Sequence, residues 1–202
     1  MAGRKIVSQS VWKLLQGRHM CRNYRDQSVP RALLLRVLEA ARKSPSAGHS
    51  QGFRLAVVTN TERRAEIAEL FGESHYRERG FEPWLSVAPV HLIAATSWEA
   101  YEERYAMPDK QTKPKEWKIP YPILDAGKSL MALYLAAQEV GLSCGFLGSH
   151  AGPDLVKIMQ LPEDWKFVGL LTLGYRSQDE ERPTRSAARG WREFDDVVRW
   201  IE

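Results

Sequence analysis

Apolar residues recur along the chain with two spacings, one typical of helices and one typical of strands. Leu34, Val37, Leu38 and Ala41 follow the i, i+3, i+4, i+7 pattern, which places them on one face of a helix. Pro30 suits the first turn of that helix, because its fixed φ angle is compatible with helix initiation. The pattern predicts an amphipathic helix that starts at Pro30 and ends at the Ser-Pro pair that follows it.

A second helix is predicted from about Ile123 to Val140. Its apolar residues cover most of the circumference, and such helices are normally central and buried. Gly141 provides the stop signal. The main stripe and the residues that widen it are Leu130, Leu133, Tyr134, Ala137, Ala126, Met131, Leu135 and Ala136.

Four apolar runs have the length and composition of strands, and shorter helices are expected between them. The runs are residues 53–59, 88–95, 143–148 and 165–174. The shorter helices are expected at residues 10–17, at 60–71 and from 153 to about 159. Their candidate caps include Ser8 or Ser10 for the first helix and Asn60 or Thr61 for the second. Residues 72–86 are expected to form a polar connection, and 194–201 a last short segment.

Residues 97–120 break this pattern. Aromatic residues are interleaved there with lysines, and they are Trp98, Tyr101, Tyr105 and Trp117. Long segments of this kind are often functional lids, and the aromatic residues favour that interpretation. A surface loop pinned by a few aromatic residues remains the alternative. Because no repeat or linker divides the chain, residues 1–202 are expected to form a single domain with a lid-like insert at about 97–120.

The composition is that of an ordinary globular protein. The 202 residues suffice for one domain with a real core, and 44% of them are hydrophobic. The net charge of +4 comes from interspersed charges, so no nucleic-acid partner is expected. No run approaches the ~18 apolar residues of a membrane span, and no apolar leader follows Met1. Cys21 and Cys144 lie far apart without a CxxC motif, which fits a reducing, cytoplasmic location.

Two short stretches carry candidate chemistry. The segment from Arg18 to Tyr24 places cationic side chains after a short helix, and positive charge suits a phosphate group. The segment from Pro45 to Gln51 is a turn of small residues, which lets backbone N–H groups approach a flat ligand. Solvated surface arginines are the simpler interpretation of the first segment when it is taken alone.

In their order along the chain these features resemble the FMN-dependent nitroreductase family. The resemblance runs from about Val11 to Val198 and includes Asp125-Ala126-Gly127 at the start of the buried helix and Leu173-Gly174-Tyr175 after the last strand. It implies an α+β fold, a nitroreductase-like fold with a central mixed β-sheet surrounded by helices. It also implies an intertwined homodimer with one FMN at each of two interface sites.

The resemblance assigns cofactor-binding positions residue by residue. Arg18, His19 and Arg22 match positions that hold the FMN phosphate and ribityl chain. Met20 stands where many members have serine, so only its backbone is available for a contact. The other implied cofactor-binding residues are Pro45, Ser46, Ala47, Gly48, Gln51, Leu147, Gly148, Ser149, Arg189 and Arg192.

Gly148 and Ser149 are the implied catalytic positions, because a backbone N–H of the family points at flavin N5 there while the cofactor supplies the chemistry. Bends in a strand are the simpler interpretation of such glycines. Arg189 and Arg192 would complete the phosphate site from the C-terminal part, and Arg185 is the alternative.

The turn and the insert supply the expected substrate-binding residues, which are His49, Tyr101, Arg104, Tyr105 and Lys110. His49 stands where many members have asparagine, and a lone histidine in a turn is otherwise an ordinary surface residue. Gly52 stands where proline is frequent, which indicates a subfamily outside the best-known reductases.

The implied reaction is ping-pong electron transfer from NAD(P)H through FMN to a nitroaromatic compound, a quinone or a similar flat acceptor. Such a cycle needs little acid–base machinery, which agrees with the absence of a catalytic triad, an HExxH motif and a Walker motif, and no metal site is expected. The alternatives are an oxygen-dependent flavin-cleaving or dehalogenating enzyme, a non-enzymatic flavin-binding or redox-sensing module, and a flavin-free interaction domain.

Overall fold

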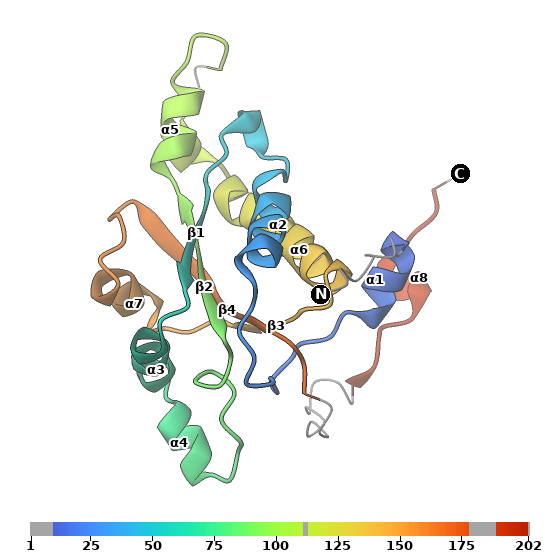
Figure 1. The fold of residues 1–202 in the computed structure, drawn as a ribbon. Helices are drawn as coiled ribbons and strands as arrows, with labels where there is room; N and C mark the ends of the chain where they lie inside the picture. Colours follow the sequence, from blue (N-terminus) through green and yellow to red (C-terminus); the bar gives the residue numbers. More distant parts are fainter. Residues whose placement is uncertain (1–9, 111–112, 178–188, 202) are drawn as a thin grey trace.

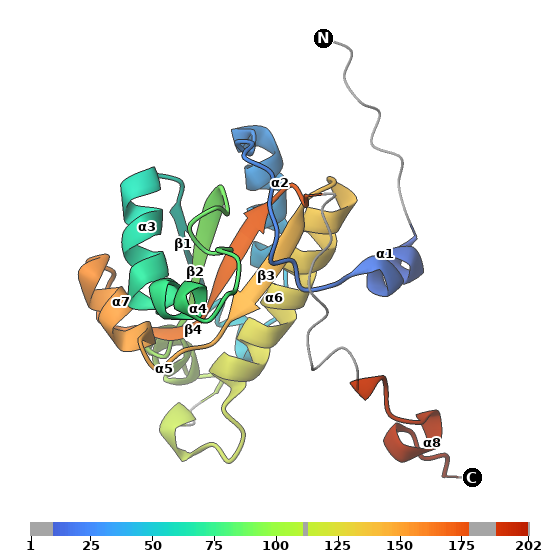
Figure 2. The ribbon, with the colours of Figure 1, turned by 90° about the horizontal axis from the view of Figure 1, so that it is seen from below.

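A computed structural model describes residues 10–110, 113–177 and 189–201 of the chain. Its centre is a β-sheet, and helices cover both faces of that sheet (Figures 1 and 2). In spatial order the strands are β1 (Phe53–Val58), β2 (Val90–Ser97), β4 (Trp165–Gly174) and β3 (Ser143–Leu147). The arrangement confirms the α+β class and the four strands that the apolar runs predict.

All strand pairs in the described sheet are antiparallel, whereas the family resemblance predicts a mixed sheet. The pairs are β1 with β2, β2 with β4, and β3 with β4. The strands β2 and β3 point in the same direction, but β4 lies between them and pairs with both. Within the described residues of one protomer the prediction of a mixed sheet is therefore wrong, because strands of equal direction never become neighbours.

The two long predicted helices pack on one face of the sheet (Figure 1). They are α2 (Arg31–Arg42) and α6 (Tyr121–Glu139). Leu34 and Val37 of α2 belong to the same buried cluster as Leu130 and Leu133 of α6 and apolar residues of β2 and β4. The predicted stripes are thus confirmed as the faces that these helices bury.

The opposite face of the sheet is covered by α3 (Thr61–Leu70) and α7 (Gly152–Ile158), as Figure 2 shows. Ile67 of α3 and Leu155 of α7 pack with Ile93 of β2 in a second buried cluster. Successive residues of a strand point to opposite faces, so the neighbouring Leu92 lies in the first cluster.

Shorter elements begin where the sequence provides caps. Before α1 (Val11–Gly17), the Ser10 Oγ accepts a hydrogen bond from the Lys13 N–H at 3.3 Å. Before α3, the Asn60 Oδ1 accepts from the Arg63 N–H at 2.8 Å. The remaining short elements are α4 (Glu73–Glu78), α5 (Glu99–Tyr105), α8 (Phe194–Val197) and the 3₁₀ helices η1 (Ala47–His49) and η2 (Pro114–Glu116).

The helix α4 lies within the polar connection predicted at residues 72–86, where no helix was expected. It has six residues, too few for an apolar repeat to emerge. Its position depends on a buried carboxylate, Glu73, which no local pattern reveals.

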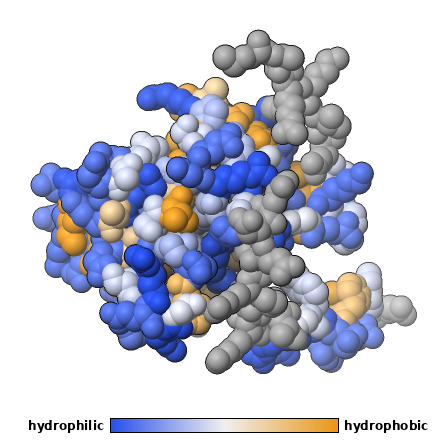
Figure 3. Space-filling view, turned by 60° about the horizontal axis from the view of Figure 1, so that its bottom comes forward, coloured by the Kyte–Doolittle hydropathy of each residue, from blue (hydrophilic) through white to orange (hydrophobic). Residues whose placement is uncertain are grey.

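Several large apolar side chains are exposed on the two terminal segments. Trp12 in α1 is 67% exposed, and Trp191 and Trp200 on either side of α8 are 92% and 78% exposed. Figure 2 shows both segments extending away from the sheet, and the face seen in Figure 3 is otherwise largely hydrophilic. In the part of the chain that the structure describes, no helix is long and apolar enough to cross a bilayer.

Candidate functional site

The turn from Pro45 to Gln51 has an unusual backbone. Gly48, His49 and Gln51 have φ angles of 60°, 59° and 52°. Positive φ is uncommon for residues with a side chain, so the two non-glycine positions store strain that the surroundings must hold. The Ser46 Oγ accepts a hydrogen bond from the Gln51 N–H at 2.8 Å, which closes the turn.

Asp125 of α6 anchors this turn. Its carboxylate is 2% exposed, and its Oδ2 accepts from the Ala47 N–H at 2.7 Å and from the Tyr101 hydroxyl at 2.9 Å. Lys128 donates to the Oδ1 at 2.8 Å, which balances the buried charge. Burial and then the hydrogen bond to Asp125 raise the pKa of Tyr101, so its hydroxyl stays a donor. A cavity of about 420 Å³ opens beside the turn, and Ser46 and Asp125 line it.

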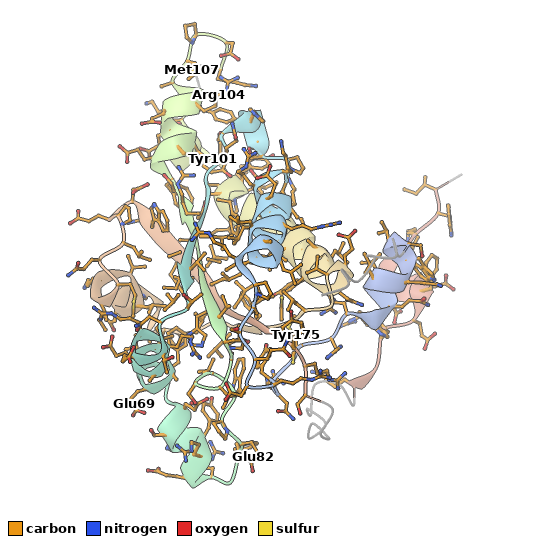
Figure 4. All side chains as sticks on the ribbon, in the orientation of Figure 1. Glu69, Glu82, Tyr101, Arg104, Met107 and Tyr175 are labelled. Carbon is orange, nitrogen blue, oxygen red and sulfur yellow. The ribbon has the colours of Figure 1, made fainter. Side chains whose placement is uncertain are left out.

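The lid-like insert is tied to the same turn. The Arg104 Nε donates to the Gly48 carbonyl at 2.7 Å, and its two other nitrogens pair with Asp109 at 2.8 and 2.7 Å. A Cβ atom at Gly48 would lie 2.7 Å from the Tyr105 ring, so a side chain there would displace the insert. Figure 4 shows Tyr101 and Arg104 on α5, at the end of the molecule that carries η1.

An aromatic cluster fixes the base of the insert. The Trp117 ring lies edge-on to Tyr105, Tyr121 and Tyr101, with centroid distances of 4.5, 5.2 and 6.3 Å. The Lys110 Nζ lies 5.6 Å above the Tyr105 ring. Both interpretations of the insert, as a lid and as a surface loop, require that aromatic contacts hold its base in place.

The structure gives the five expected substrate-binding residues different environments. Tyr101 is fully buried and Arg104 is bonded to Gly48 and Asp109, so both act on the turn. Tyr105 and Lys110 are partly exposed, and His49 is exposed.

The cationic segment runs beside β3. The Cys21 N–H donates to the Cys144 carbonyl at 2.8 Å. The Tyr24 hydroxyl and the Thr172 Oγ1 are 2.7 Å apart, and this bond ties the segment to β4. Neither cysteine forms a disulfide and both are buried, and burial raises the pKa of the Cys144 thiol, so Cys144 is no nucleophile at neutral pH. The expected phosphate-binding segment is thus fixed to the strand that leads to Gly148.

Arg18 and His19 line a second cavity of about 190 Å³ at the C-terminal end of α6. The His19 Nδ1 lies 3.2 Å from the Gly17 carbonyl, which only accepts, so Nδ1 carries the proton. The His19 Nε2 is buried, and no described residue bonds to it. A ligand hydroxyl, or a phosphate oxygen when the ring is protonated, would satisfy it. Met20 next to it is 36% exposed.

The end of β3 is open. Gly148 is exposed, and no atom lies within 4 Å of the position that a Cβ would take there. The Ser149 Oγ accepts from the Ala151 N–H at 3.1 Å and so fixes the turn after Leu147. A flat molecule therefore meets no side chain at Gly148.

One protomer does not bring all the predicted cofactor-binding residues together. The turn contacts Asp125 near the start of α6, whereas Arg18 and His19 share their cavity with Gln138 near its end. The 13 intervening steps of 1.5 Å place these two ends of α6 roughly 20 Å apart. Neither cavity contains residues of both groups.

The C-terminal arginines form a third group. Arg189 and Arg192 are exposed on the segment that leads to α8, and Figure 2 shows this segment away from the sheet. The alternative, Arg185, lies outside the described residues.

Three residues beside the candidate site were not predicted as site residues, although Asp125 belongs to the motif quoted for the family resemblance. Asp125, an acidic residue among the buried positions of α6, was a usable signal, because buried carboxylates need partners. Trp84 and Glu73 gave no signal, since their contacts join segments far apart in sequence.

A model of the Nitroreductase family matches residues 15–175. An iodotyrosine dehalogenase 1 homolog of Caenorhabditis elegans is 26% identical over 85% of this chain, which spans 56% of that protein. A 5,6-dimethylbenzimidazole synthase of Rhodospirillum rubrum is 26% identical over 88% of this chain and 87% of its own length. The solved structure of an FMN-dependent nitroreductase from Clostridium difficile has a TM-score of 0.67 at 17% identity, covering 94% of this chain and 98% of that one.

Proposed function

Because the chain belongs to the Nitroreductase family, we propose that it is an FMN-dependent oxidoreductase that passes electrons from NAD(P)H to a small flat acceptor. A nitroaromatic compound or a quinone has the required shape. The name of the C. difficile neighbour supports FMN as the cofactor. FMN, when bound, supplies the electron-transfer chemistry, and the chain supplies binding and orientation.

The unpartnered His19 Nε2 beside Arg18 carries this proposal. A buried polar atom without a partner costs free energy, and a bound ligand would recover that cost. Arg18 and Arg22 add charge for a phosphate, and an arginine fork matches phosphate oxygens in geometry. The residues present therefore fit the anionic end of FMN.

The turn and Gly148 fit the flat part of FMN. The turn presents backbone atoms of Ser46 to Gln51 in a fixed, strained shape, and Asp125 holds that shape. Gly148 leaves room for close approach, so the backbone of Gly148 and Ser149 can donate to a ring nitrogen. These groups orient the ring and provide no acid or base.

A homodimer would unite the two groups. We infer that each site takes Arg18, His19 and Arg22 from one protomer and the turn from its partner. The exposed Trp12 and Trp200 support this assembly, since large apolar side chains on projecting segments are buried in oligomers more often than left in water.

An anaerobic absorbance spectrum tests the function. Purified protein with added FMN is recorded before and after NADPH, and in a second sample before and after NADH. We expect the flavin band to bleach, and the recovery of the band with nitroaromatic and quinone acceptors then ranks substrates. The absence of any bound flavin contradicts the proposal.

The named relatives provide a second candidate class, because one is a dehalogenase homolog and another a dimethylbenzimidazole synthase. A flavin band that persists with NAD(P)H favours this class or a sensing module. Product analysis after chemical reduction separates them. Released halide or a cleaved flavin indicates the enzymes, and unchanged flavin indicates a sensor.

A further inference from the structure

We propose that Tyr134 and Gln138 of α6 bind the phosphate of FMN together with Arg18 and His19, so that FMN is preferred over a flavin that lacks the phosphate. The inference rests on the proposed function, which assigns Arg18 and His19 to the anionic end of FMN. Tyr134 belongs to the apolar stripe of α6, and no motif of the sequence includes Gln138. The sequence alone therefore assigns neither residue to a ligand.

One cavity of about 190 Å³ brings these four side chains together. It lies where α1 ends, beside the C-terminal end of α6 and the first residue of β3, Ser143. Figure 1 shows α1 next to this end of α6. Pockets that enclose a whole drug-sized ligand have volumes of about 300–1,000 Å³, so this cavity has room for one end of a flavin and not for its ring system.

The polar side chains that line the cavity have few partners in the protein. They belong to Arg18, His19, Tyr134, Gln138 and Ser143. Among the residues that the structure describes, the one hydrogen bond that these five side chains make joins the His19 Nδ1 to the carbonyl before it in the chain. The His19 Nε2 is buried without a described partner. Polar groups that converge on a cavity without bonding to one another are groups that a ligand can satisfy.

Tyr134 offers a hydroxyl to this cavity. Its ring packs against the buried cluster of α2, α6 and the sheet, which holds the side chain in place. Burial raises the pKa of Tyr134, and the charge of Arg18 acts on it in the opposite direction. The hydroxyl is thus within electrostatic reach of Arg18 and stays protonated, so it can donate to an anion.

Gln138 offers an amide from the same helix face. It follows Tyr134 by four residues, and residues with this spacing lie above one another on a helix. A Cβ atom at Gly17 would overlap the Gln138 amide, so the amide lies against the backbone just before Arg18. An anion bound by Arg18 is therefore within reach of a neutral donor from α6.

The charges around the cavity favour an anion. None of the described residues that line it is acidic, and Arg18 supplies a positive charge. Glu139 at the end of α6 is paired with Arg36 at 2.9 Å. The last carbonyl groups of α6 carry partial negative charge, but they accept hydrogen bonds from the N–H groups of residues 140–142. These negative groups of α6 are thus engaged elsewhere, and the side chains of the cavity remain for the phosphate.

The test compares the dissociation constants of FMN and riboflavin in two isosteric variants, by flavin-fluorescence titration of the full chain. Tyr134→Phe removes only the hydroxyl. We expect it to weaken FMN about five- to twentyfold and riboflavin by less than about twofold, because riboflavin lacks the phosphate. Gln138→Glu adds a negative charge with little change of shape. FMN should weaken about tenfold or more, and riboflavin again by less than about twofold.

Matched controls place the same changes outside the cavity. Tyr76→Phe removes the hydroxyl of an exposed tyrosine on α4, and Gln160→Glu adds a charge at an exposed position after α7. Both dissociation constants should keep their wild-type values in these controls. The phosphorus NMR resonance of FMN, bound at saturation, provides a second readout. It should shift in Tyr134→Phe and stay in place in Tyr76→Phe, because the nucleus senses the groups that bond to the phosphate oxygens.

Equal losses for FMN and riboflavin, or unchanged FMN binding in a variant, overturn the assignment of the residue that was changed. If Tyr134→Phe does not fold, Gln138→Glu still carries the comparison. Wild-type protein that binds both flavins equally tightly overturns the role of the cavity in phosphate recognition, while the proposed function stands. Wild-type protein that binds neither flavin overturns the proposed function itself, which separates the two failures.

Discussion

Glu73, His91 and Asp125 are buried polar side chains that bond to backbone groups of loops beside the candidate site. Each holds a loop that has no regular hydrogen-bond ladder of its own. A buried polar atom that finds its partner in one loop conformation favours that conformation, because the alternatives leave the atom unpaired. At the scale of residues, the site therefore depends on side chains that need not touch a ligand.

Asp125→Asn should loosen the turn at residues 45–51. The amide keeps one acceptor but loses the charge that pairs with Lys128 and faces the Ala47 N–H and the Tyr101 hydroxyl. We expect a loss of about 1–3 kcal/mol in the free energy of unfolding, measured by urea denaturation. FMN and riboflavin should weaken by similar factors, since the proposed function assigns the turn to the ring that both ligands share. Glu103→Gln, an exposed acid on α5, is the control, and an Asp125→Asn variant as stable as this control contradicts the assigned anchor.

His91 should make the protein sensitive to acid. Burial lowers the pKa of His91 from 6.5 to about 4, although Glu73 opposes this shift and Arg64 adds to it. Below pH 6.5 the His91 side chain is protonated in the unfolded chain, whereas in the folded chain it becomes protonated only near pH 4. Because the unfolded state binds more protons in this range, the free energy of unfolding decreases as the pH falls from about 6.5 to about 4. Between about pH 7.5 and about pH 5 the loss is about 2 kcal/mol.

Urea denaturation of the wild type and of His91→Gln at both pH values isolates this effect. The variant removes the titrating group, so its loss on acidification should be smaller by about the same 2 kcal/mol. Glu73 and Arg64 remain in both proteins and cancel in the comparison. Equal losses in the two proteins would show that His91 does not titrate with the lowered pKa.

Sequence reasoning found the residues whose type alone suggests a ligand contact, and it missed those that act through other residues. Arg18 and Arg22 carry charge in a short segment, and that is visible locally. The contact between Glu73 and the loop at Trp84 spans 11 residues, and that between Asp125 and Ala47 spans 78. Such pairs exist only once the fold brings distant segments together.

At the scale of elements, the helices with strong apolar periodicity were predicted correctly, whereas the structure of the short polar segments was not predicted. The stripes of α2 and α6 are confirmed, because burial of an apolar face is what forms a helix in a protein. The helix α4 and the turn η1 are held by hydrogen bonds to Glu73 and Asp125 instead of by an apolar face. The insert at residues 97–120 is held in both ways. Its helix α5 buries the Tyr101 side chain, and Arg104 of the same helix forms a hydrogen bond with the turn.

Trp117→Ala should release the insert without unfolding the sheet. The indole contacts Tyr101, Tyr105 and Tyr121 edge-on, so it links the three rings to one another. We expect faster amide hydrogen exchange in α5 than in β2, and a Michaelis constant for the acceptor that rises about threefold or more. Trp117→Phe should retain most of the protection. A cooperative loss of protection throughout the sheet would instead make the cluster part of the global core.

Removal of the whole insert is a poorer test, because residues 97–120 include the end of β2 and the buried Tyr101. A deletion of that length removes strand pairing and the partner of Asp125 together. Substitutions at Trp117 act on the segment beyond α5 and leave those contacts in place.

At the scale of the whole molecule, strand order and assembly lie beyond local patterns. Four apolar runs predict four strands, but they do not predict that β4 lies between β2 and β3. That order depends on the paths of the connections that contain α6 and α7. The family resemblance supplied the fold class together with a mixed sheet, whereas the strand pairs described in one protomer are all antiparallel. The distance of roughly 20 Å between the two ends of α6 became apparent only in three dimensions. This distance is the reason for proposing a site that takes its residues from two protomers.

Mixed dimers of two defective chains test that arrangement. Arg18→Glu removes the proposed phosphate contact, and Gly48→Val puts a side chain against Tyr105 at a φ of 60°. Each variant alone should bind little FMN. If every site combines the cationic segment of one protomer with the turn of its partner, the heterodimer has one doubly defective site and one site built only from wild-type segments.

The tagged heterodimer, purified after co-expression, should therefore bind one FMN per dimer by absorbance. If each protomer instead binds FMN on its own, every site keeps one defect and the heterodimer binds none. Light scattering provides the independent check, because a dimer of the 23.1 kDa chain has about twice that mass. A monomer that binds FMN would contradict the shared site, since Arg18 and the Gly48 turn would then have to serve one ligand across the length of α6.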